Sequence, residues 1–194
     1  MIKIIKPKKF KETEKKNLVS YFKNTFPNIY CTHLSQTKII KLYDKQKHSY
    51  NDDEPKGLYY SLKFERFLED RQYGYKYMYG IKFNKKKIYT NINNPNKNLI
   101  LQINTLNDEE KYVQIYGKNI VLKKIRCTKG KNIKYFEKYV VKKFDYNKLV
   151  NDFAGVEFRN KNRKYIIGFY TKKNYGVIWN VRIIKELILM LQTY

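Results

Sequence analysis

The chain has few residues of the types that build metal centres and disulfide frameworks. Its 194 residues include two cysteines, Cys31 and Cys127, and two histidines, His33 and His48. The cysteines form no closely spaced pair, which argues against a zinc site and against a disulfide framework. Two histidines cannot supply a multi-histidine site. We therefore expect no metal cofactor, and an intracellular location in the cytoplasm or nucleus of a host cell.

Long apolar runs are also missing. Residues 1–6 are basic and lack the longer apolar core of a signal peptide. The most apolar tail, residues 177–191, is interrupted by polar and charged side chains, so we expect no membrane span. The sequence shows no internal repeat and no linker rich in proline, glycine and serine. This favours one domain over residues 1–194.

Acidic residues are scarce relative to basic ones. Lys and Arg number 42 and Asp and Glu number 17, which gives a formal net charge of +25 at pH 7. This charge predicts a polyanionic partner, either nucleic acid or acidic protein. The basic residues are mostly lysines, whereas arginine suits bidentate recognition of bases better. Abundant Lys, Asn, Ile and Tyr also fit a low-GC coding sequence, so we expect loose, salt-sensitive binding without sequence preference.

The order of expected elements favours an α+β fold. Helices and strands are interspersed without regular alternation, which predicts a mixed or mainly antiparallel sheet flanked by short helices. Residues 135–143 fit either a helix or a strand. The aromatic segment 73–83 is expected to pair with residues 88–92. Helices are expected at residues 12–25, 64–71, 108–116, 145–153 (ended by Gly155) and 181–191. A short strand followed by a basic connector is expected in residues 1–10. Further strands are expected at residues 28–33, 57–63, 99–103, 120–127, 156–158, 165–170 and 176–179.

The sharpest change from loop to strand chemistry is Pro-Lys-Gly-Leu-Tyr-Tyr-Ser at residues 55–61. On a strand, Tyr59 and Ser61 share one face and Tyr60 lies on the other. A glycine such as Gly57 before an aromatic strand allows a flat ligand to approach the backbone and stack on a ring. The same pattern also fits a turn into an ordinary core strand.

Three fragments in this order resemble the ADP-ribosyltransferase superfamily, specifically its His-Tyr-Glu branch of diphtheria-toxin-like and poly-ADP-ribose-polymerase-like enzymes. His33 and Ser35 match the strand end that reads His-Gly-Ser/Thr in that branch. Residues 57–61 match its Gly-aliphatic-Tyr-aromatic-small strand, and Tyr73 and Glu157 match a later tyrosine and glutamate.

The chain departs from that branch at three points. Leu34 stands where the branch has glycine, and the gap from Tyr59 to Tyr73 is longer than is typical. No second glutamate lies two residues before Glu157, as it does in the arginine-modifying branch.

The resemblance implies an ADP-ribosyltransferase-like fold and the use of NAD to modify a nucleic-acid or protein acceptor. Glu157 would be catalytic, because a carboxylate bonded to the ribose stabilises an oxocarbenium-like transition state. On this basis Glu157→Gln would abolish NAD cleavage and leave the fold nearly intact. Two tyrosines would sandwich the nicotinamide. The implied NAD-binding residues are His33, Ser35, Gly57, Tyr59, Ser61 and Tyr73.

Two other classes of function remain open. A non-catalytic nucleic-acid-binding protein of a low-GC virus or parasite would explain the charge and the 16% aromatic content, because a basic groove with stacking rings binds single strands. A structural or host-interaction protein would use the same composition differently. The first alternative is compatible with NAD use, since a basic surface could carry an acceptor to the NAD site.

Overall fold

The computed structural model describes residues 2–8, 15–43, 57–62, 75–127, 134–159 and 174–192. Tyr73, the helix expected at 64–71 and the strand expected at 165–170 lie outside the described residues. The helical elements are α1 (Lys15–Thr25), α3 (Leu106–Tyr116), α4 (Tyr146–Asp152) and the 3₁₀ turn η3 (Val181–Ile183). The strands of the large sheet are β1 (Ile2–Lys8), β2 (Cys31–Ser35), β3 (Leu58–Ser61), β4 (Tyr77–Phe83), β5 (Tyr89–Thr90), β6 (Asn96–Ile103), β9 (Phe153–Phe158), β10 (Tyr175–Ile178) and β11 (Ile184–Gln192).

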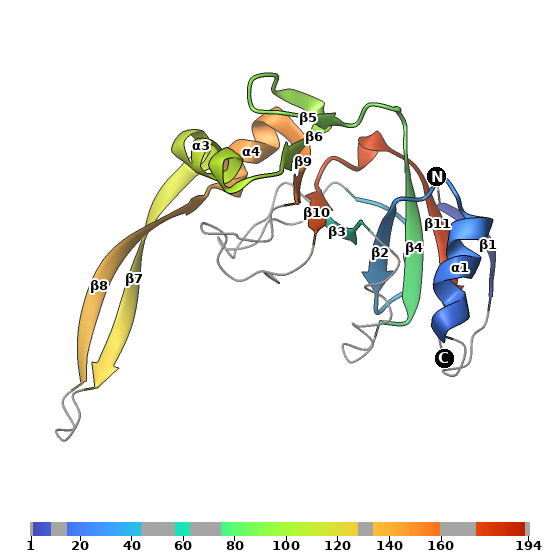
Figure 1. Ribbon diagram of the computed structural model, residues 1–194, viewed down its shortest axis with the longest axis horizontal. Helices are drawn as coiled ribbons and strands as arrows, with labels where there is room; N and C mark the ends of the chain where they lie inside the picture. The colour runs from blue at the N-terminus through green and yellow to red at the C-terminus, as the bar shows by residue number, and fades with distance from the viewer. Residues whose placement is uncertain are drawn as a thin grey trace.

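Within the described residues, nine strands form one sheet in the order β1-β11-β4-β2-β3-β10-β9-β6-β5 (Figure 1). The pairs β1–β11, β6–β9 and β5–β6 are parallel, and the other neighbouring pairs are antiparallel. Short helices accompany the sheet. The expectation of an α+β fold with a mainly antiparallel, mixed sheet is confirmed.

The expectation of a helix at residues 181–191 is wrong. A 3₁₀ turn at Val181–Ile183 leads into strand β11, which lies between β1 and β4. Residues 187–191 are buried without interruption along this strand. A continuous apolar run fits a strand covered on both faces as well as it fits a buried helix. Here the strand form satisfies the backbone on both sides through two neighbouring strands.

Three further expectations are corrected or resolved by strand pairing. Strand β4 pairs with β2 and β11, and not with residues 88–92, whose strand β5 pairs with β6. Residues 135–143 form a strand, within β8 (Lys134–Phe144). Helix α4 ends at Asp152, and Gly155 lies inside β9. A side chain at Gly155 would come within 2.4 Å of the Val177 carbonyl oxygen, so this glycine allows β10 to approach closely.

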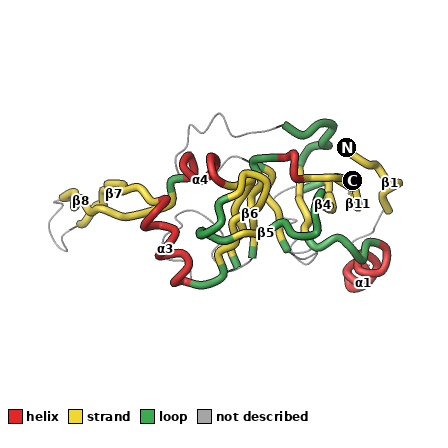
Figure 2. Tube along the Cα trace, turned by 90° about the horizontal axis from the view of Figure 1, so that it is seen from above, coloured by secondary structure: helices red, strands yellow, loops and turns green. Residues whose placement is uncertain are grey.

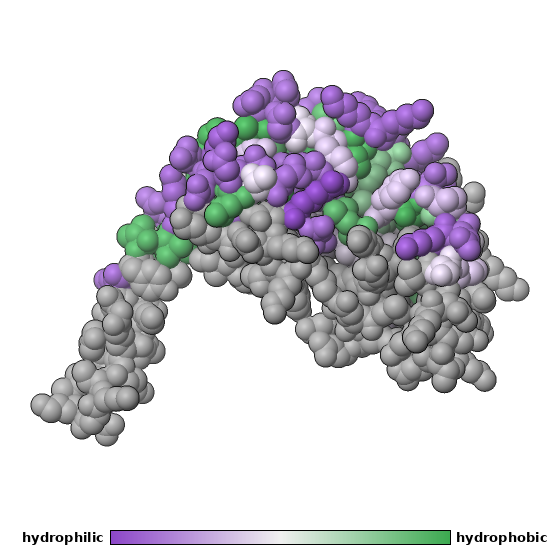
Figure 3. Space-filling model, viewed as in Figure 1, coloured by the Kyte–Doolittle hydropathy of each residue, from purple (hydrophilic) through white to green (hydrophobic). Residues whose placement is uncertain are grey.

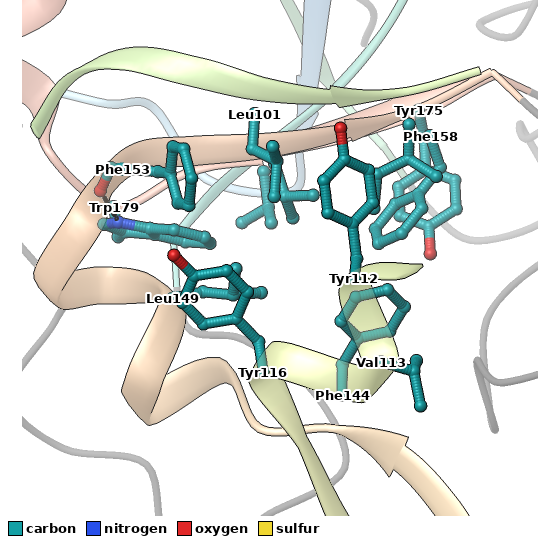
Figure 4. Close-up of a cluster of buried hydrophobic side chains, with 13 residues drawn as sticks. Leu101, Tyr112, Val113, Tyr116, Phe144, Leu149, Phe153, Phe158, Tyr175 and Trp179 are labelled. Carbon is teal, nitrogen blue, oxygen red and sulfur yellow. Dashed lines mark hydrogen bonds between the residues drawn. The ribbon is translucent and has the colours of Figure 1, made fainter. Parts of the chain in front are cut away.

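One face of the sheet packs on α3 and α4 (Figure 4). Thr105 begins α3 with a capping box, in which its side chain accepts from the Asp108 amide and Asp108 accepts from the Thr105 amide. The single tryptophan, Trp179, is fully buried in this cluster and donates from Nε1 to the Phe153 carbonyl oxygen at 2.6 Å. We refer to this cluster as the α3–α4 core.

Strands β7 (Gly117–Cys127) and β8 (Lys134–Phe144) pair only with each other among the described strands. They form an antiparallel hairpin that extends away from the large sheet in both views (Figures 1 and 2). We call this hairpin the arm. In the part of the chain that the structure describes, no helix is long and apolar enough to cross a membrane.

Candidate functional site

Glu157 is a fully buried carboxylate that accepts hydrogen bonds from four side chains. It lies on β9, an interior strand, and is 0% exposed. Its Oε2 atom accepts from the hydroxyls of Tyr60 and Tyr89, each at 2.8 Å. Its Oε1 atom accepts from Gln102 Nε2 at 3.1 Å and from Arg159 Nε at 2.7 Å. A carboxylate has about four acceptor sites, so these donors fill it. We call these five residues the Glu157 network.

The sheet register brings the network together. Glu157 is paired with Gly176 on β10 and with Gln102 on β6, and Gly176 is paired with Tyr60 on β3. Paired residues share a face, so these side chains point to the same side. A side chain at Gly176 would come within 2.3–2.6 Å of atoms of the Tyr60 ring. The glycine therefore leaves the space through which Tyr60 reaches across β10 to Glu157.

The electrostatics of the network keep its donors protonated. Burial and the charge of Glu157 raise the pKa of the Tyr60 hydroxyl well above its usual value, and the same two causes raise the pKa of Tyr89. Burial lowers the pKa of Arg159, but the hydrogen bond and charge of Glu157 outweigh it, so the pKa is raised. The Arg159 guanidinium lies 5.4 Å from the Tyr89 ring centroid, in a cation–π arrangement.

Cys31 lies close to this network. Its side chain is buried, and burial together with the charge of Glu157 raises the pKa of the thiol to about 12. The thiol therefore stays protonated at neutral pH, which makes it a poor nucleophile. Among the described residues, no group of three or more His, Cys, Asp and Glu side chains could hold a metal ion.

A pocket of about 770 Å³ adjoins the network at the end of the sheet where β3, β4 and β9 finish and β2, β10 and β11 start. Tyr89 and Arg159 belong to its wall, and we call it the Tyr89–Arg159 pocket. Leu62 and Ile81 give it an apolar part. Its described lining includes no carboxylate but five cationic side chains, namely Lys82, Lys85, Lys86, Lys185 and Arg159.

A second pocket, of about 850 Å³, shares Tyr89 with the first. Gln102 lines it too, so three of the four donors to Glu157 line one pocket or both. This pocket is mostly polar and lies over the asparagine-rich turn between β5 and β6. The buried Glu157 carboxylate thus accepts hydrogen bonds from side chains that line both pockets.

The structure brings some residues of the sequence-based site together and separates others. His33 Nδ1 lies 2.6 Å from the Tyr59 carbonyl oxygen. The Tyr59 side chain, however, packs against the α3–α4 core, on the face opposite to Glu157. Its neighbour Tyr60 contacts Glu157 instead. The Ser61 hydroxyl lies on the same face as Tyr59, 3.1 Å from the Thr32 hydroxyl.

Ser35 and Gly57 lie at the ends of β2 and β3 that are remote from the Tyr89–Arg159 pocket. The Ser35 hydroxyl donates to the Thr37 carbonyl oxygen at 2.6 Å. A side chain at Gly57 would come within 2.5 Å of the Ile178 carbonyl oxygen. The space beside Gly57 is therefore occupied by β10, and the close packing of these two strands accounts for a glycine at this position.

Sequence reasoning selected Glu157 but none of its four donors. Arg159 had a usable signal, because residues two apart on a strand share a face. Tyr60 follows from Glu157 only once the pairing of β9, β10 and β3 is known. Tyr89 and Gln102 are far from Glu157 in the sequence and have no local signal.

In comparisons with protein-family models, curated proteins and solved structures, the chain has no match. A functional conclusion has to come from the site itself, because a fold alone does not specify a function.

Proposed function

We propose that the Tyr89–Arg159 pocket binds a nucleotide, and that NAD is the ligand to test first. The observation that carries the proposal is the combination of five cationic side chains with the Tyr89 ring in the described wall of one pocket. Phosphate groups attract the cations, and a planar base or nicotinamide packs against an aromatic ring. The volume of about 770 Å³ lies within the range of small-molecule sites.

Arg159 is suited to a phosphate because it is held in place. Its Nε–H donates to Glu157, and its side chain is 41% exposed. A guanidinium has further N–H donors on its terminal nitrogens, and their fork geometry matches a phosphate. A fixed guanidinium loses less conformational entropy on binding than an unrestrained one. Glu157 therefore acts as a positioning residue for Tyr89 and Arg159.

ADP-ribosyl transfer from NAD to a nucleic-acid or protein acceptor is the reaction that the sequence resemblance suggests for this site. Glu157 is the candidate carboxylate, since the two side chains that bond it, Tyr89 and Arg159, line the pocket. Its acceptor sites are filled in this arrangement, so direct contact with a ribose hydroxyl requires one donor to give way. The developing positive charge of the transition state would favour such an exchange.

Calorimetric titration with NAD, ADP and inorganic phosphate tests the binding site. We expect Lys85→Ala/Lys86→Ala to weaken NAD binding by about tenfold, which corresponds to about 1.4 kcal/mol. Lys148→Ala is the matched control, because Lys148 is exposed on α4 and does not line the pocket. If the wild-type protein binds none of the three ligands, or if the double variant binds NAD as the wild type does, the pocket assignment fails.

Release of nicotinamide from NAD by the wild-type protein tests the reaction separately. Turnover that is lost in Glu157→Gln, at a temperature where the variant is folded, supports the transferase. NAD binding without any nicotinamide release in the presence of nucleic-acid or protein acceptors refutes the transferase and leaves a binding protein.

Non-catalytic nucleic-acid binding is the second candidate function, and the net charge of +25 favours it. A surface of this kind binds polyanions mainly by releasing counterions from phosphates. We propose binding that is salt-sensitive and weakly sequence-dependent, with nucleic acid or acidic protein as the partner inside a host cell. Anisotropy measurements at two salt concentrations test this, and a strong preference for one sequence that persists at high salt would contradict it.

A further inference from the structure

The arm carries an excess of positive charge. Strands β7 and β8 each contain four lysine or arginine residues, and the two strands together contain one acidic residue, Glu137. Lys138 and Lys142 are exposed. The arm is therefore a basic ribbon with little acid of its own to compensate it.

The cross-strand register places like charges opposite each other. Lys123 is paired with Lys138. Like charges directly opposite one another destabilise a two-stranded ladder. An isolated hairpin is marginally stable even without such pairs. Both features would be relieved by a polyanion that binds along the arm.

The root of the arm is fixed to the α3–α4 core. Phe144, at the end of β8, is 1% exposed and packs at 5.8 Å from the Phe158 ring. The Asp145 amide donates to the Tyr116 carbonyl oxygen at 2.6 Å, which joins the end of β8 to the end of α3. A side chain at Gly117 would overlap the Val113 carbonyl oxygen, so the chain can enter β7 directly from α3 only with glycine there. The arm is thus a projecting element on an anchored base.

Two valines on the arm are exposed side by side. Val121 and Val140 are paired in the ladder and are 61% and 66% exposed. A hydrophobic patch is visible on the described part of the arm nearest the sheet (Figure 3). A cationic ribbon with a small apolar centre fits a surface that offers phosphates at its edges and apolar contacts between them.

We propose that the arm is a nucleic-acid-binding element that lies in the major groove of double-stranded DNA. This groove, about 12 Å wide, admits a two-stranded β-ribbon, and its floor offers thymine methyl groups to apolar side chains. Eleven residues in each strand span roughly 35 Å, close to one turn of the duplex. The deep, narrow major groove of double-stranded RNA does not admit such a ribbon.

The exposed lysines of the arm, Lys138 and Lys142, would contact phosphates and supply affinity without sequence preference. This inference rests on the nucleic-acid-binding part of the proposed function and specifies its element and its partner. It is independent of nucleotide binding in the Tyr89–Arg159 pocket.

Fluorescence anisotropy with a 20-base-pair DNA duplex tests the proposal. Binding is measured between 50 and 200 mM salt for the wild type, for Lys138→Ala/Lys142→Ala and for the control Lys97→Ala/Lys148→Ala. The slope of log K against log salt is negative, and removal of each phosphate contact reduces its magnitude by about 1. We therefore expect the magnitude of the slope to fall by about 2 in the arm variant and to stay at the wild-type value in the control. The pocket is unchanged in all three proteins, so NAD titration is the internal reference.

The outcomes distinguish a failure of nucleic-acid binding from a failure of the role assigned to the arm. If the wild type binds no nucleic acid, nucleic-acid binding itself fails. If the wild type binds duplex DNA and the arm variant keeps its slope, only the role of the arm is overturned. Arm-dependent binding that is equal or stronger for single-stranded DNA, double-stranded RNA or polyglutamate would overturn the major-groove assignment.

Discussion

The large sheet and the arm differ in what surrounds their charged side chains. In the sheet, the buried carboxylate of Glu157 is surrounded by four donors from the protein itself. In the arm, Lys123 is paired with Lys138, and Glu137 is the only acidic residue of the two strands. A buried carboxylate surrounded by donors stabilises one conformation, whereas an excess of one sign of charge on a projecting element attracts an external partner. The Glu157 network therefore stabilises the fold of the sheet, whereas the arm is suited to binding a polyanion.

Substitution of Glu157 is expected to have the largest effect. Glu157→Ala leaves three hydroxyl and amide donors and the Arg159 guanidinium without their acceptor. Each buried donor that loses its acceptor costs about 1–3 kcal/mol, and the loss of several donors at once adds to this. Urea denaturation of the wild type and the variant measures the free energy of unfolding.

Glu157→Gln is the informative companion variant. Its amide nitrogen would face two donors, so it can accept from only part of the network. The filled carboxylate thus argues against the sequence-based expectation that this substitution leaves the fold nearly intact. We expect a loss smaller than that of Glu157→Ala but well above 1 kcal/mol, since an unsatisfied buried donor costs about 1–3 kcal/mol. Wild-type stability in Glu157→Gln would contradict the network.

Gly176→Ala is expected to have the next largest effect. A methyl group there would overlap the Tyr60 ring and displace its hydroxyl from Glu157. Overpacking of this kind costs about 1–3 kcal/mol. Tyr60→Phe is the matched comparison, because it removes the hydroxyl without adding volume. A Gly176→Ala variant that is as stable as the wild type would show that Tyr60 does not cross β10 as described.

The contrast between sheet and arm also explains what the sequence could predict. Helix α3 and strand β7 follow local sequence patterns, and both were predicted close to their observed bounds, as residues 108–116 and 120–127. Residues 181–191 were predicted as helix because apolar residues in that segment fall at helical spacing. Their state depends on β1 and β4, which local spacing does not encode.

The candidate site was predictable only in part for the same reason. Glu157 stood out as a lone acid in an apolar segment, and it is the centre of the network. The tyrosine that contacts it is Tyr60 and not Tyr59, because a choice between these two residues is a choice of sheet face. That choice depends on which face packs on α3 and α4, and this is a property of the tertiary structure.

Alkaline pH is expected to lower the free energy of unfolding because of the Cys31 thiol. Its pKa is raised from 9.0 to about 12 in the folded protein. The folded state therefore holds its proton more tightly than the unfolded state, and the stability from this group is complete below pH 9 and is lost as the pH rises toward 12. At pH 10 the expected loss is about 1.4 kcal/mol, one pH unit above the unfolded pKa.

Urea denaturation at pH 7 and pH 10 measures this effect, with Cys31→Ala as the control that removes the titrating group. The wild type should lose more stability than the variant between the two pH values. An equal loss in both proteins would show that the thiol is not buried beside Glu157.

The smallest effect is expected in the arm. Lys138→Glu replaces a like-charge pair with Lys123 by an opposite-charge pair. Such pairs contribute about 0.2–1 kcal/mol, so stability should stay the same or rise slightly, while affinity for duplex DNA should fall. Thermal denaturation and anisotropy on the same variant measure both. A loss of stability together with unchanged DNA binding would contradict the claim that the charge of the arm serves binding and not stability.

A double-mutant cycle on Tyr60 and Tyr89 tests the central claim most directly, namely that Glu157 joins side chains from separate strands into one network behind the pocket. Both hydroxyls donate to the same oxygen, Oε2, at 2.8 Å. Urea denaturation of Tyr60→Phe, Tyr89→Phe and the double variant should give a coupling energy of about 0.5–3 kcal/mol, as residues of one hydrogen-bond network do. Effects that add to within about 0.3 kcal/mol, as they do for independent sites, would contradict the account.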